Sequence, residues 1–119
     1  MAKAVFVQKG ENIDYKAETD IGYMDVVPME KCIGVALEPI AAGKTGTVAL
    51  EGVYSLTAKS AASGCAIKVG DVVFWDKTYE NIDTDESGVP AGIAVEEKAS
   101  AGTSAKVKLG FVYAAPSEP

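Results

Sequence analysis

Two short segments of this chain carry residue types and spacings that bind ligands in other proteins. The first, Gly43-Lys44-Thr45, resembles the end of a P-loop, in which a glycine-rich turn cradles phosphate and leads directly into a helix. A P-loop also needs a glycine five residues before its Gly-Lys pair, and Glu38 occupies that position. The residues after Lys44 read as a strand and not as a helix. We therefore expect a turn between two strands and no phosphate site.

The second segment is Asp83-Thr84-Asp85-Glu86-Ser87-Gly88, which matches the first half of a calcium-binding EF-hand loop. Oxygen ligands stand at alternate positions and a glycine allows the sharp bend. The second half of the motif is missing, because position 94, where the bidentate glutamate belongs, is alanine, and Pro90 interrupts the approach to a helix. We expect a solvated acidic turn and no metal ion or cofactor.

Catalysis by a nucleophile is poorly supported, since the chain contains no histidine and no arginine. A serine or cysteine nucleophile needs a base, and only lysines and carboxylates are present to serve. With 17 Asp and Glu residues, a hydrolase that uses a carboxylate pair stays open as a weaker alternative. The composition favours a binding or structural protein over an enzyme.

Net charge and hydropathy limit the classes of partner that the protein can bind. The net charge is −6 and the lysines are scattered singly, so the localised positive face that nucleic acid requires is missing. Apolar runs such as Val72-Val73-Phe74-Trp75 are far shorter than the roughly 20 residues that span a bilayer, so we expect no membrane partner. The N-terminus shows no apolar stretch of signal-peptide length, which predicts synthesis in a cytoplasm. Cys32 and Cys65 are expected to be unpaired thiols.

The 119 residues suffice for one domain with one core. Apolar residues alternate or run in short blocks and turn residues separate them, which is typical of an all-β protein. We predict a small single-domain β-sandwich or β-barrel-like fold with at most one short helix, within residues 56–66. The predicted strands are residues 4–8, 13–15, 31–37, 46–56, 71–76, 92–97 and 104–113.

Within this pattern three segments have particular roles. Ala105, Val107 and Leu109 alternate with polar residues, as a strand with one packed and one solvated face requires. Trp75 is expected in the core or in a subunit interface. Residues 1–10 are interpreted as a possible arm; within them, residues 4–8 are equally consistent with an ordinary edge strand of the domain's own sheet. The proline-containing residues 114–119 are interpreted as a frayed tail.

Several segments, taken in order, resemble one family: the bacteriophage capsid cement, or head decoration, proteins, formerly described as a domain of unknown function. No single piece is specific, but their order and spacing together carry the resemblance. The segments are residues 1–15, 33–36, 40–43, 50–54, 67–76, 92–96 and 107–109. The acidic stretch at residues 77–88 and the extension beyond Leu109 depart from the plainest form of the pattern.

The resemblance implies a non-enzymatic structural protein on the exterior of the virion capsid. It binds the outside of an assembled phage head and stabilises it, with the major capsid protein as partner and commonly as a homotrimer. An arm that adds a strand to a capsid sheet would supply the attachment, and the capsid-contact candidates are Ala4, Val5, Phe6, Val7 and Gln8.

A rival reading is a small β binding module of a phage tail or surface protein, specific for a carbohydrate or a receptor. Such a module needs a concave site lined by exposed aromatic side chains, so the exposure of Trp75 separates the two readings.

Overall fold

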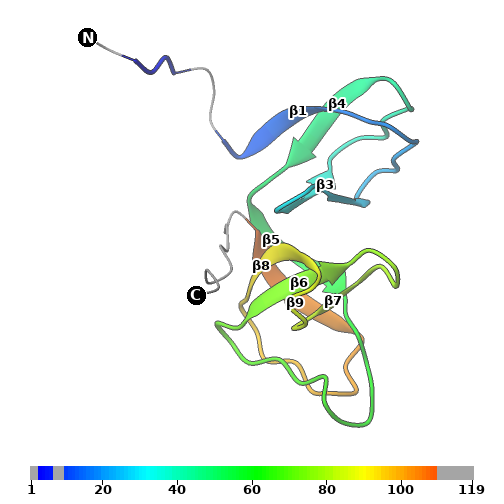
Figure 1. The fold of residues 1–119 in the computed structure, drawn as a ribbon, viewed down its shortest axis with the longest axis vertical. Coiled ribbons are helices and arrows are strands. Elements are labelled where there is room, and N and C mark those ends of the chain that lie inside the picture. Colours follow the sequence, from blue (N-terminus) through cyan, green and yellow to red (C-terminus); the bar gives the residue numbers. More distant parts are fainter. Residues whose placement is uncertain (1–2, 7–9, 110–119) are drawn as a thin grey trace.

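The computed structural model describes residues 3–6 and 10–109, and these residues form nine β-strands and no helix. The strands build two antiparallel sheets, which lie one above the other in Figure 1. The sequence prediction of an all-β, single-domain fold is therefore confirmed. No helix in the described part of the chain is long and apolar enough to cross a membrane.

The first half of the described chain forms the four-stranded sheet. Its strands, in the spatial order β1-β4-β3-β2, are β1 (Asn12–Lys16), β4 (Thr45–Ala49), β3 (Ile33–Ala36) and β2 (Val26–Pro28). Each neighbouring pair is antiparallel. β1 and β2 are the outer strands, so this sheet is open at both sides.

The second half forms the five-stranded sheet. Its spatial order is β5-β9-β8-β6-β7, with β5 (Gly52–Thr57), β9 (Ser104–Leu109), β8 (Val89–Ala94), β6 (Val72–Asp76) and β7 (Asn81–Asp83). The two outer strands meet, because Ala58, just after β5, forms a parallel bridge to Ile82 of β7. The Lys59 N–H donates to the Ile82 carbonyl oxygen at 2.9 Å. The sheet thus curls into a small closed barrel, visible as the lower part of Figure 1.

The main core fills this barrel and extends to the other sheet. Ala105, Val107 and Leu109 of β9 are buried and the residues between them are exposed, which confirms the alternation predicted from the sequence. Ile33 and Val35 of β3 join the same apolar cluster. The opposite face of β3 belongs to a second cluster, built from Ala17, Val27, Ala36, Ile40 and Val48. β3 is therefore buried on both faces and ties the two sheets together.

Close packing of β8 on β9 depends on Gly92. This residue has φ of +150°, a backbone conformation that residues with a Cβ atom rarely adopt. A Cβ atom there would collide with the carbonyl oxygen of Lys108 on β9. Nearby, the register between β6 and β8 shifts at Val73 and Phe74, and such a bulge bends a strand, as a small closed barrel requires.

Several predicted boundaries were wrong. Residues 46–56 form two strands, because the chain leaves the first sheet at Ala49 and enters the second at Gly52. Residues 56–66 contain no helix; β5 continues to Thr57 and a loop follows. The strand predicted at 92–97 is β8, which starts at Val89 and ends at Ala94. The short strands β2 and β7 were not predicted.

The two ends of the chain also differ from the prediction. Residues 3–6 form no strand, and Val7 and Gln8 lie outside the described residues. The last predicted strand, 104–113, is observed as β9 up to Leu109, and its remainder and the predicted tail at 114–119 lie outside the described residues.

Candidate functional site

The loop at residues 83–88 is a turn stabilised by its own side chains. Asp85 accepts a hydrogen bond from the Ser87 N–H at 2.9 Å, and hydrogen bonds from the Ser87 backbone and side chain hold the pKa of Asp85 below its ordinary value. Asp83 lies 3.6 Å from the Lys59 ammonium. The EF-hand fragment is therefore an acidic turn in this structure, as the sequence indicated.

A polar cavity of about 260 Å³ lies beside this turn. Asp76 contributes to its lining, but one carboxylate oxygen of Asp76 caps the next turn by accepting from the N–H groups of Thr78 and Tyr79. Asp83 and Asp85 are engaged as described above. Within the described ranges no three histidine, cysteine or acidic side chains gather as metal ligands.

The P-loop fragment is also a turn. Gly43 has φ of +82°, and the Lys44 N–H donates to the Ala41 carbonyl oxygen at 2.9 Å. β4 begins at the next residue, Thr45. The motif therefore leads into a strand, as predicted, and supplies no helix N-terminus for phosphate.

The two cysteines are free thiols, as expected from the sequence. Cys32 is partly buried beside Met29, with 3.9 Å between the sulfur atoms, and burial raises the pKa of the Cys32 thiol. Cys65 is buried in the loop region of the barrel. A raised pKa disfavours the reactive thiolate of Cys32.

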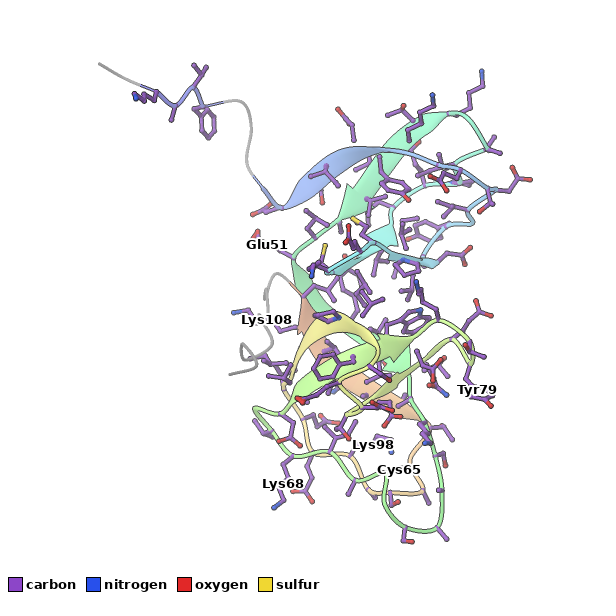
Figure 2. The ribbon with its side chains drawn as sticks, in the orientation of Figure 1. Glu51, Cys65, Lys68, Tyr79, Lys98 and Lys108 are labelled. Carbon is purple, nitrogen blue, oxygen red and sulfur yellow. The ribbon has the colours of Figure 1, made fainter. Side chains whose placement is uncertain are left out.

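Lys98 is a buried cation that the sequence did not reveal. Its side chain is 4% exposed, and its ammonium donates to the carbonyl oxygens of Cys65, Ala99 and Ser100 at 2.8, 3.0 and 3.3 Å. Figure 2 shows Lys98 beside Cys65 at the end of the barrel farther from the open sheet. The three carbonyl groups use all three donors of the ammonium, so Lys98 joins two long loops.

Trp75 lies in the barrel core. It is 6% exposed and belongs to the main apolar cluster, where it pairs with Ile82 and Val89 on the neighbouring strands. An exposed aromatic platform for a sugar therefore cannot be built on Trp75.

Among the described residues, the large apolar side chains with the highest exposure are in the N-terminal segment. Val5 is 85% exposed and Phe6 is 83% exposed, and Ala4 is exposed as well. In Figure 1 residues 3–6 lie well away from both sheets. These apolar side chains gain little stability from packing within the described fold.

These features define a class of protein: a small all-β domain built around two apolar clusters. The sequence profile of the family described as phage cement protein matches residues 7–109. Because this match covers most of the chain, the chain belongs to the phage cement protein family, and it is a structural protein of the phage capsid. No curated protein and no solved structure matches the chain.

Proposed function

We propose that this protein binds the outside of an assembled phage head and stabilises the shell, without catalysing a reaction. The observation that carries the proposal is the family match over residues 7–109. The exposed N-terminal Val5 and Phe6 support it, since they offer a contact surface outside the packed domain. The major capsid protein is the proposed partner.

The N-terminal segment makes the proposed capsid contact, through Ala4, Val5, Phe6, Val7 and Gln8. In the free protein the described part of this segment, residues 3–6, is not paired with the domain. Docking by strand addition would use its main-chain N–H and C=O groups for affinity and its alternate side chains for specificity. Val5 and Phe6 would then become buried at the shell.

Three copies joined as a trimer complete the proposal. Each arm alone makes a small contact, but once one arm has docked, the other two meet the shell at high effective concentration. A weak contact per subunit thereby becomes firm attachment of the trimer.

The test uses purified protein and expanded heads that lack it. Val5→Pro and Val7→Pro remove main-chain donors that a docked strand needs, so co-sedimentation with heads should fall while the melting temperature stays nearly unchanged. Val5→Thr and Val7→Thr are the matched controls, because threonine keeps the N–H and the β-branched shape.

Two results would count against this function. If the wild-type protein neither binds such heads nor raises the temperature at which they break open, the cement role fails. If the proline variants bind as the threonine variants do, the capsid contact lies elsewhere on the domain.

A further inference from the structure

β1 is hydrogen-bonded to β4 along one of its two sides. The Leu50 N–H donates to the Glu11 carbonyl oxygen at 2.8 Å, and the Ala17 N–H donates to the Lys44 carbonyl oxygen at 2.9 Å. In an antiparallel pair the bonding residues alternate along a strand. Between these two bonds, therefore, Ile13 and Tyr15 bond to β4, and the backbone groups of the intervening residues point away from it.

The outward-facing backbone groups include those of Asp14 and Lys16. β1 is the outer strand of its sheet, so no strand of this chain lies beyond it among the described residues. The register with β4 runs without a break from Asn12 opposite Ala49 to Lys16 opposite Thr45. β1 thus offers a regular edge that contains no proline and no bulge.

Proteins usually protect such an edge, because it can pair with any extended chain. The other edges in this fold are shorter or closed. β2 has three residues and ends on Pro28, and the barrel strands β5 and β7 are linked through Ala58 and Ile82. β1 is longer than β2, and its outer edge is joined to no other strand among the described residues.

We propose that the outer edge of β1 accepts an extended strand of the phage shell protein, by main-chain hydrogen bonds to Asp14 and Lys16. This inference rests on the proposed function, which supplies the shell as partner. The position of β1 next to the N-terminal segment favours the shell protein as the partner. The N-terminal segment leads into β1 through Gly10 and Glu11, so one shell surface can meet the arm and the edge together.

The side chains of β1 suit an added strand. Ile13 and Tyr15 are half-buried and pack against the second apolar cluster, so alternate side chains of an adjoining strand can extend that apolar layer. Asp14 and Lys16 are exposed and carry opposite charges.

The variant that tests the edge is Asp14→Pro. Its N–H faces outward, so proline removes a donor that the fold itself does not use. Apparent affinity for heads should fall by about tenfold or more, with the melting temperature within a few degrees of wild type. Asp14→Thr, which removes the charge and keeps the N–H, should bind as wild type does. Tyr15→Pro removes a donor to β4 and should destabilise the fold.

Amide hydrogen exchange provides a second readout that does not depend on any variant. The amides of Asp14 and Lys16 should exchange at least about tenfold more slowly on heads than in the free protein. Normal binding by Asp14→Pro, or unchanged exchange at Asp14 and Lys16 on heads, would overturn the inference. Equal protection in the free oligomer would also overturn it, by assigning the edge to a second copy.

This outcome is separable from the cement role. If wild-type protein binds and stabilises heads while Asp14→Pro does the same, the proposed function stands and only the edge inference fails. Absence of wild-type binding would instead remove the proposed function itself.

Discussion

The two sheets of this protein differ in how they end. The five-stranded sheet closes on itself through the bridge between Ala58 and Ile82, and its interior is filled by the main core. The four-stranded sheet is open, with β1 and β2 at its sides. We infer that the two sheets have different tasks within one small domain. Closure joins the outer strands of the barrel to each other, whereas the outer edge of β1 is the proposed docking site for a partner.

The largest loss of stability is expected from a charge placed inside the barrel. Val107 is 0% exposed and lies on β9, between β5 and β8. Val107→Asp buries an unpaired carboxylate and should lower the free energy of unfolding by about 4 kcal/mol or more. Chemical denaturation measures the change. Ser104→Asp, at an exposed position of the same strand, is the control and should change stability by less than about 0.5 kcal/mol.

The Val107 variant also reports on the open sheet. Because Ile33 and Val35 of β3 pack into the same cluster, we expect both sheets to unfold in one transition. Survival of a folded four-stranded sheet in Val107→Asp would show that the sheets are independent.

A second, smaller effect is expected where the barrel loops are joined. Lys98→Met keeps a long side chain but removes the donors to three carbonyl groups. Leaving such groups without partners should cost about 2–4 kcal/mol. Thermal melting compares it with Lys68→Met, an exposed position, which should be nearly neutral. A stability equal to wild type would mean that the ammonium does not hold the loops.

The third expected loss of stability comes from forcing β8 and β9 apart. Gly92→Ala places a methyl group against the Lys108 carbonyl oxygen, so the strands must separate, at a cost of about 2–3 kcal/mol. Gly64→Ala is the control, because Gly64 also has positive φ but its Cβ would meet no atom within 4 Å. That substitution should cost about 1 kcal/mol from backbone strain alone. Equal losses in the two variants would remove the steric explanation.

The sequence predicted those strands whose own residue pattern indicates which face is packed and which is solvated. β9 alternates between packed and solvated residues, so its position could be read directly. The break between β4 and β5 could not, because Leu50 and Glu51 carry no turn signal of their own; the chain turns there to pass from one sheet to the other. Residues 56–66 have helix-compatible composition, but tertiary contacts with the barrel loops decide their structure.

At the candidate site, too, only features that a short stretch of sequence contains could be predicted. Both ligand-like loops were correctly interpreted as turns, because a missing residue at a fixed position can be checked in the sequence. Lys98 could not be recognised, since a lysine is ordinarily exposed and its three carbonyl partners come from two loops. The open edge of β1 was equally hidden, because which strand is outermost depends on pairing between distant segments.

The position of β9 has a consequence for the time the protein needs to fold. β9 lies between β5 and β8, and its pairing joins Gly52 to Leu109, so the barrel cannot form until the last described strand has found the fifth. The open sheet uses only residues 12–49 and needs no such distant partner. Long-range strand pairing of this kind gives folding times on the order of milliseconds to seconds. The pairing of β9, which completes the barrel, is therefore expected to limit the folding rate of the whole domain.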